Sequence, residues 1–387
     1  LAGSKKVESA ICAELEPLVI ETDRYWAPYN GQILADPRVK ARYADGRTMI
    51  MGSDRPFDAL VSVPSNPWIA GIGNLYTQDF YQSVRDKLNP GGVYLQWVNL
   101  YAISPADLQI ILRTFHSVFP EAQLWAIGGD IALIGGNGRA SRDLMQDYYR
   151  EALWLRLELA EIGFSSVDQL VGSYLCPLAT AVEHIPAGPL NTDDNPILEY
   201  SAPFSMYSGE SYSKNLHWMY SMRQAYSRGP DGIELDAQSD LSASLGSMAF
   251  PQSPTPRLLT ISGPSEPFRE LFDLMKSRGD FDDKQHRRRL DWISRYPAWE
   301  EGRATLAHNA LIFDYFQHAL DYCPSQQAIA AMDEVRRYMW LRIRATSNFG
   351  VGHWQSALDD YRALSQFRQF CDFDSAAAYC CWRLKDW

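Results

Sequence analysis

The sequence predicts an α/β fold, an open and mostly parallel sheet with helices on both faces, followed by an α-helical C-terminal region. Two observations predict it. Strand-like and helix-like segments alternate over residues 1–140, and a helical pattern returns from about residue 286. The 387 residues are enough for two or three domains with a sizeable core.

The alternating region is expected to begin with a buried strand at 7–15, a short helix at 17–30 and a second strand at 39–43. A Ser cap at residue 104 and the breaker Asn89-Pro90-Gly91-Gly92 mark helix limits farther on. The remaining expected elements are a strand at 57–63, a helix at 77–88, a strand at 93–98, a helix at 104–119, and a hairpin made of 123–127 and 131–134.

Three domains are expected. Residues 1–205 form the α/β domain, of which 141–205 are mainly helical. Residues 206–285 are dense in Ser, Gly, Pro and Asp, which favours a linker or an extended wrap. Residues 286–387 are expected to be helical. A single helix face there carries Trp354, Ala357, Tyr361 and Leu364, which is typical of a tetratricopeptide-like helix pair or of an isolated bundle.

Composition narrows the function classes. A formal net charge of −11 argues against a nucleic-acid surface, which needs concentrated basic residues. The six cysteines include no C-x-x-C pair and the seven histidines no H-E-x-x-H, so no metal site is predicted. No apolar run is long enough for a membrane span, and a cytoplasmic location is expected. Because the chain starts on Leu inside a patterned segment, a fragment of a longer protein is expected.

Polar and aromatic residues stand at the ends of successive expected strands, where open α/β sheets bind ligands. Glu14 ends the first strand, and Asp45 follows the second. Gln96 and Trp97 end the fourth. The third runs into the loop "VPSNPW", which contains no acid. Each residue alone is as well explained by turn chemistry or by the core; together they predict a site.

Several motifs in order carry a family resemblance: "AELEP", "LADPRVKARYADGR", "FDALVSVPSNPWIAGIGNLYTQDFYQSVRDKLNPGGVYLQWVNLYAISPADL" and "LNTDDNPILEY". Residues 1–205 resemble the spermidine synthase-like proteins (polyamine aminopropyltransferases), in particular the bacterial branch in which this domain follows a membrane-embedded region. The resemblance implies a Rossmann-like, class I methyltransferase-type fold. It also implies decarboxylated S-adenosylmethionine or S-adenosylmethionine as the ligand, with Glu14 on the ribose and Asp45 on the adenine.

The loop after the third strand departs from this family. The resemblance implies one acid that helps deprotonate the attacking amine and a second that holds the cationic end of the polyamine. Val63 and Asn66 stand at these two positions. Valine takes no proton, and an amide supplies no charge for an ammonium. The weak candidates for a substitute base are the acids Asp79, Asp193 and Asp194, and the substrate-binding candidates are Asn66, Gln96 and Trp97.

A second departure concerns the start of the domain. The family's glycine-rich loop and central first strand would lie before Leu1, so an upstream segment or another chain is expected to complete the sheet. The favoured function is a non-catalytic assembly or accessory subunit, with the C-terminal helices as the partner surface and a membrane complex as one candidate partner. The alternatives are an active aminopropyltransferase, or another S-adenosyl-dependent transferase acting on a polyamine, and a sensor that binds without turnover.

Overall fold

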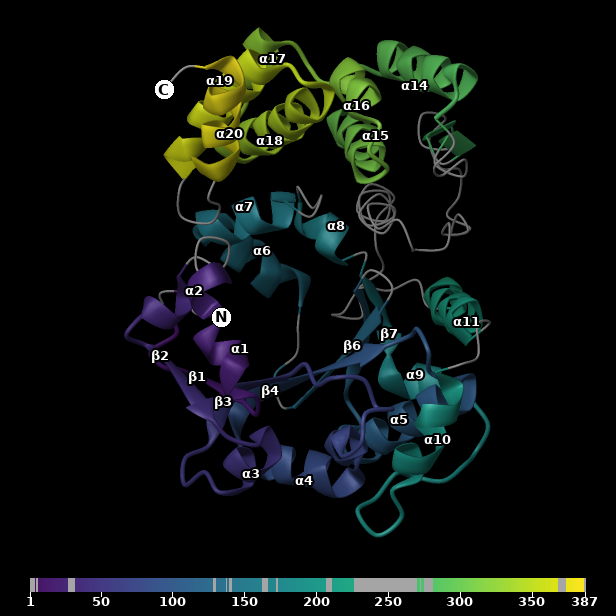
Figure 1. Ribbon diagram of the computed structural model, residues 1–387. Coiled ribbons are helices and arrows are strands. Elements are labelled where there is room, and N and C mark those ends of the chain that lie inside the picture. Colours follow the sequence, from purple (N-terminus) through teal and green to yellow (C-terminus); the bar gives the residue numbers. More distant parts are fainter. Residues whose placement is uncertain are drawn as a thin grey trace.

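The computed structural model describes residues 4, 6–26, 32–127, 130–136, 138, 141–161, 166–171, 173–206, 211–225, 270–271, 273–274, 281–367 and 374–385. A sheet region lies at one end of the molecule and a helical layer at the other (Figure 1). Within the described residues, no helix is both long and apolar enough to cross a membrane.

The strands form two separate sheets. β1 (Ala10–Glu14) pairs in parallel with β2 (Val39–Tyr43). The second sheet has the order β3-β4-β6-β5-β7, where only β3 (Phe57–Ser62) and β4 (Leu88–Asn99) run parallel. β4, β5 (Gln123–Ile127), β6 (Asp130–Gly136) and β7 (Tyr174–Pro177) are joined by antiparallel pairings. The α/β fold with a helical C-terminal region is confirmed, but the sheet is mixed rather than mostly parallel, because the β5–β6 hairpin and β7 add three antiparallel pairings.

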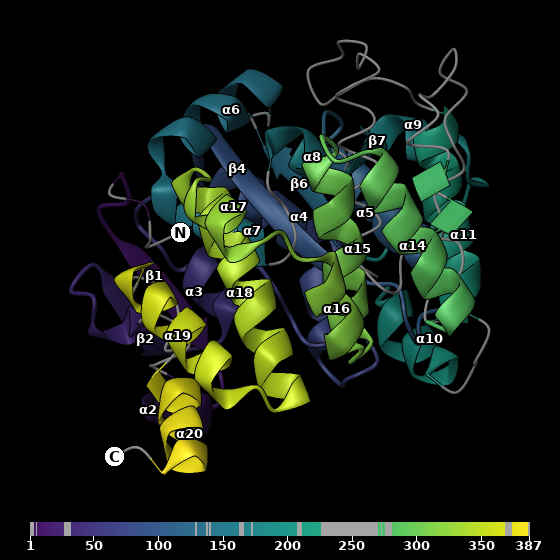
Figure 2. The same ribbon diagram turned by 90° about the horizontal axis from the view of Figure 1, so that it is seen from above.

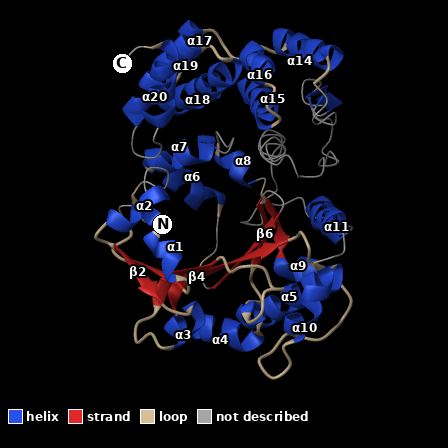
Figure 3. Cartoon of the chain, in the orientation of Figure 1, coloured by secondary structure: helices blue, strands red, loops and turns tan. Residues whose placement is uncertain are grey.

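Helices cover the five-stranded sheet on the face shown below it in Figures 1 and 3. These are α3 (Gly46–Met51), α4 (Gln78–Asp86), α5 (Pro105–Val118), α9 (Leu178–Glu183) and α10 (Ile197–Ser205). Thr77 and Ser104 cap α4 and α5 by accepting backbone N–H bonds, and the cap at Ser104 was predicted from the sequence. Tyr81, Tyr94 and Phe115 pack together at the centre of this core.

The strand expected at 7–15 is shorter and more exposed than predicted. β1 is neither buried nor central, and the Ile11 side chain is 48% exposed. The reason is topological: among the described residues β1 pairs with β2 alone, so no described strand lies along its other edge. The segment expected as one helix at 17–30 gives the short helices α1 (Pro17–Glu21) and α2 (Asp23–Trp26), and its end lies outside the described residues.

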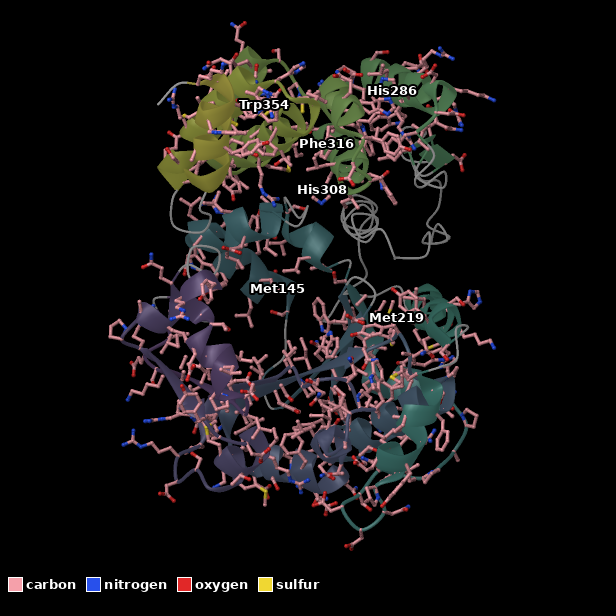
Figure 4. The ribbon with its side chains drawn as sticks, viewed as in Figure 1. Met145, Met219, His286, His308, Phe316 and Trp354 are labelled. Atoms are coloured by element: carbon pink, nitrogen blue, oxygen red, sulfur yellow. The ribbon has the colours of Figure 1, made fainter. Side chains whose placement is uncertain are left out.

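The expected linker at 206–285 contains a helix. α11 (Ser211–Ala225) docks on the sheet domain, with Leu216 and Met219 in the core and the Asn215 side chain donating to the carbonyls of Leu100 and Ile103 (Figure 4). The segment forms a helix despite the linker-like composition around it, because its apolar residues pack into the core of the sheet domain. Residues 226–269 lie outside the described part of the chain, so the linker expectation there stays a prediction.

The helical layer comprises α14 (Asp283–Arg295), α15 (Glu300–Ile312), α16 (Phe316–Tyr322), α17 (Gln326–Ala330), α18 (Glu334–Val351), α19 (Trp354–Leu364) and α20 (Asp374–Leu384). Short 3-10 turns lie at Ile33–Ala35, Ile72–Tyr76 and Ser365–Phe367. The helix predicted around Trp354 is α19, which turns Ala357, Tyr361 and Leu364 into the core against α18, its neighbour in Figure 2.

Three further helices connect the two layers: α6 (Arg142–Glu151), α7 (Leu153–Glu161) and α8 (Val167–Val171). Leu157 and Ala160 of α7 belong to the same apolar cluster as Trp292 and Trp340 of the C-terminal helices. Met145 of α6 instead packs against Trp125 and Tyr174 of the sheet (Figure 4). The helical layer thus recruits a segment from inside the expected domain 1–205.

Candidate functional site at the ends of the strands

The loop after β3 lies at the carboxyl ends of β3 and β4, where a ligand of an open α/β sheet would bind. The side chain of Val63 is 68% exposed, so it is a surface group and no part of the core. Asn66 follows three residues later in the same loop, where its backbone carbonyl accepts the N–H of Ile69.

Tyr101, which follows β4, fixes the amide of Asn66. The Tyr101 hydroxyl donates to Oδ1 of Asn66 at 3.0 Å. The Trp68 ring meets the Tyr101 ring edge to face at a centroid distance of 5.9 Å. These three residues form one open cluster, the amide cluster, at the site. Sequence reasoning did not find Tyr101, because nothing in its local pattern shows that it reaches back to the neighbouring loop.

The acids proposed for the adenosine side both make local contacts. Asp45 caps α3 by accepting the backbone N–H of Thr48 at 2.7 Å, the turn-chemistry role considered for it. Glu14 accepts the N–H of Glu16 at 2.9 Å. Each contact uses one carboxylate oxygen, and no described residue donates to the other. Both acids therefore fit a role in holding hydroxyl or amino groups of an adenosyl ligand, which stays a prediction.

Gln96 and Trp97 point to opposite faces of β4. Gln96 is fully buried, where its Oε1 accepts the Tyr94 hydroxyl and its Nε2 donates to the Trp97 carbonyl. The Trp97 side chain instead acts on Asp130, where it lowers the pKa of that carboxyl against the larger effect of burial. Of the two, only Trp97 lies on the less buried face of the sheet.

The candidate bases Asp79 and Asp193 contact each other's segments. Asp193 pairs with Arg47 and accepts the Thr77 hydroxyl at 2.8 Å, and Asp79 accepts the backbone N–H of Asp193 at 2.8 Å. The hydrogen bond from the Arg47 guanidinium holds the pKa of Asp193 below its usual value. A carboxylate bound in this way is a poor proton acceptor. Asp194 is exposed.

The segment "NTDDNPILE" fastens the rest of the loop after β3. Buried Asn191 donates to the carbonyls of Gly73 and Tyr76, at 3.2 and 3.1 Å. The Glu199 carboxylate accepts the N–H of Gly71, at 2.9 Å, where a positive φ of 83° favours glycine. We call residues 191–199 the clasp. These contacts connect segments of the fold, but neither Asp193 nor Asp194 caps α10, whose first turn has no side-chain cap, so the capping role weighed for these acids stays a prediction.

Asp130 is an acid at the site that the sequence did not single out. It is half-buried at the start of β6, opposite Asn99, and accepts the backbone N–H of Leu100 at 3.3 Å. Burial raises the pKa of Asp130. Its position in the sheet, decided by the β4–β6 pairing, brings it beside Trp97. Among the described residues, no group of three or more His, Cys, Asp or Glu could hold a metal ion.

Comparison with known proteins locates the resemblance. Residues 3–127 match the family model described as "Spermine/spermidine synthase domain". The chain is 36% identical over 88 residues to the polyamine aminopropyltransferase of Nitrosomonas europaea, covering 22% of this chain and 27% of the relative. It is 32% identical over 119 residues to that of Thermotoga maritima, covering 31% and 40%. The chain thus spans less than half the length of these curated relatives.

Solved structures match over a similar part. A spermidine synthase in complex with the transition-state analogue AdoDATO is 22% identical, with a TM-score of 0.33 over 39% of this chain and 53% of that one. Human methyltransferase-like protein 13 in complex with SAH is 22% identical, with a TM-score of 0.30 over 38% and 70%.

Proposed function

Because residues 3–127 form a spermidine synthase-like segment, we propose that this chain is an accessory or assembly subunit that does not transfer aminopropyl groups to a cationic amine. The observation that carries the proposal is the exposed Val63 side chain at the position of the expected proton acceptor. Asp193 of the clasp is a poor replacement, since it is occupied by Arg47 and Thr77. An ammonium must lose a proton before it can attack.

A transfer assay tests this proposal. The full chain is incubated with decarboxylated S-adenosylmethionine and 1,4-diaminobutane, and release of methylthioadenosine is measured against a blank without protein. We expect no release above the blank. Turnover that rises in proportion to protein concentration would overturn the proposal.

The second candidate is an active aminopropyltransferase, or another S-adenosyl-dependent transferase acting on a polyamine. It is favoured by the names of the matched relatives, which are polyamine aminopropyltransferases, and by Asp130, whose raised pKa suits a proton acceptor. If the transfer assay shows turnover, Asp130→Asn should abolish it, whereas Asp194→Asn, at an exposed acid of the clasp, should not.

We also propose that the site keeps an adenosyl ligand, either decarboxylated S-adenosylmethionine or S-adenosylmethionine, held by Glu14 and Asp45. Support comes from the resemblance and from the uncommitted oxygen on each carboxylate. Calorimetry with methylthioadenosine should detect binding that Glu14→Gln weakens. Heat that is unchanged in this variant would remove Glu14 from the site.

The partner proposed here is an extended segment between β1 and β3, supplied upstream or by another chain. Support comes from the two separate sheets and from the exposed apolar residues Ile11, at 48%, and Val61, at 51%. Hydrogen exchange of β1 and β3 amides should slow when this partner is present.

The helical region is proposed as a further partner surface. A cytoplasmic location, with membrane association through a partner, follows from the branch that the sequence resembles.

A further inference from the structure

Asn66 has a fixed orientation in the loop after β3. Its carbonyl oxygen Oδ1 accepts the Tyr101 hydroxyl at 3.0 Å. An amide carries one acceptor oxygen and an NH2 group with two donors. The oxygen already accepts one hydrogen bond, whereas no described residue offers an acceptor to the NH2, so both of its donors are available to a ligand.

This orientation reverses the polarity of the position. A carboxylate there would offer only acceptor oxygens and would attract an ammonium. The Asn66 amide, held by Tyr101, offers donors. The described contacts of the amide cluster include no carboxylate that could take the place of the missing charge.

The cluster is also open to a ligand. Tyr101 is 41% exposed and is held by the Trp68 ring, while Val63 of the same loop is an exposed apolar side chain. An alkyl chain lying on Val63 would remove apolar surface from water. A polar group at the end of that chain could then meet the Asn66 NH2.

We propose that this site takes a short alkyl chain whose end carries a carbonyl-type oxygen, a carboxylate or an amide, in place of a second ammonium, and that Tyr101 is the positioning residue that sets this preference. The inference rests on the proposed function, in which the loop no longer handles a cationic amine. It adds the ligand class that the loop does accept.

The test compares three probes of equal chain length by calorimetry on the full chain with methylthioadenosine present: 4-aminobutanoate, 4-aminobutanamide and 1,4-diaminobutane. At least one of the two oxygen-bearing probes should bind about tenfold or more tightly than the diamine. The reason is that the diamine offers the Asn66 NH2 no acceptor, and a polar group left without its partner lowers binding affinity by about that factor. Which of the two binds more tightly decides between a charged and a neutral end.

Two variants examine the cause. Asn66→Asp has nearly the same shape and should reverse the preference towards 1,4-diaminobutane. Tyr101→Phe frees the amide to turn and should reduce the discrimination between the probes. Tyr379→Phe is the matched control, since Tyr379 has the same 41% exposure but lies on α20 of the helical layer; it should leave all three affinities unchanged.

Two results would overturn the inference: diamine binding at least as tight as that of both oxygen-bearing probes, or no measurable binding of any probe. A preference that survives Tyr101→Phe at full strength would remove Tyr101 from the explanation. The proposed function fails separately, if 1,4-diaminobutane is converted in the transfer assay. Diamine preference without conversion contradicts only the inference.

Discussion

Single residues decide the chemistry of the loop after β3. Val63 and Asn66 lie three positions apart, yet one is a bare apolar surface group and the other is fixed by Tyr101. Neither provides a negative charge, so the loop can neither deprotonate nor attract an ammonium by itself. Asp193 of the clasp is committed to Arg47 and Thr77.

The double substitution Val63→Asp and Asn66→Asp should supply both missing charges. We expect aminopropyl transfer to 1,4-diaminobutane to rise by about 10²-fold or more above the unsubstituted chain, the usual contribution of a positioned base. Release of methylthioadenosine measures it, with Val63→Asn as the uncharged control. If binding of methylthioadenosine persists while transfer stays at background, more than these two charges is missing.

Asp193→Asn should lower stability and leave ligand binding intact. The pair with Arg47 is partly exposed, with the Asp193 side chain 40% accessible, so we expect a loss of about 0.5–1 kcal/mol in the free energy of unfolding. Because the pKa of Asp193 is lowered in the folded protein, this contribution exists above its unfolded pKa and disappears as the pH falls through the folded value. Urea denaturation at pH 7 gives the difference.

The neighbouring Asp194→Asn is the control for that measurement, since Asp194 is exposed. An equal loss in both variants would show that the Arg47 pair contributes nothing. A loss of methylthioadenosine binding in Asp193→Asn alone would instead give Asp193 a role at the site.

At the scale of elements, one short segment holds several others in place. The clasp connects the loop after β3 to α5, because Asn191 contacts Gly73, Tyr76 and Thr114 at once. Asp107 of α5 adds a buried carboxylate that accepts the hydroxyls of Ser201 and Ser205 of α10. The position of the candidate site therefore depends on contacts more than one hundred residues away in the sequence.

Asn191→Ala should strongly destabilise the sheet domain. The substitution leaves three buried backbone groups without their partner: the carbonyls of Gly73 and Tyr76 and the N–H of Leu198. We expect a loss of about 2–4 kcal/mol in the free energy of unfolding. Thermal denaturation measures it, with the exposed Asn195→Ala as the control. Similar melting temperatures for the two variants would contradict the role of the clasp.

The described residues contain two large apolar clusters, one beside the sheet and one in the helical layer. The helical layer also contains partly buried histidines. Desolvation and the nearby Arg342 lower the pKa of His308 to about 4. Burial and His286, whose ring stacks on His318 at a centroid distance of 3.8 Å, also lower the pKa of His318. Figure 4 labels His286 and His308 in this layer.

The helical layer should therefore lose stability in mild acid. A histidine whose folded pKa is lowered is neutral in the folded protein, so stability is complete above the unfolded pKa and falls as protons bind the unfolded chain below it. For His308 this window runs from 6.5 down to about 4. At pH 5 the free energy of unfolding should be lower by on the order of 2 kcal/mol than at pH 7.5.

Melting temperatures at pH 7.5 and pH 5 test this expectation. His308→Gln should reduce the drop between the two values, and His217→Gln, at an exposed position of α11, should not. An identical drop in the unsubstituted protein and in His308→Gln would rule out His308 as the cause.

Much of the fold could be predicted from local patterns. The second strand, the cap at Ser104, the β5–β6 hairpin and the apolar face of α19 all follow from short-range periodicity and turn chemistry. The exposure of β1 and the helix α11 inside a linker-like stretch could not be predicted, because each depends on which partner surface is available.

The sequence by itself determined that residues 3–127 resemble a spermidine synthase domain. It also determined that positions 63 and 66 carry Val and Asn instead of acids, since motif order and residue type are properties of the chain alone. The tertiary structure decided what those positions can bind. Only folding brings the Tyr101 hydroxyl to the Asn66 amide, draws Asp193 to Arg47 and leaves β1 and β3 in separate sheets. Such contacts join residues far apart in the chain, and their geometry is fixed by packing rather than by any local pattern.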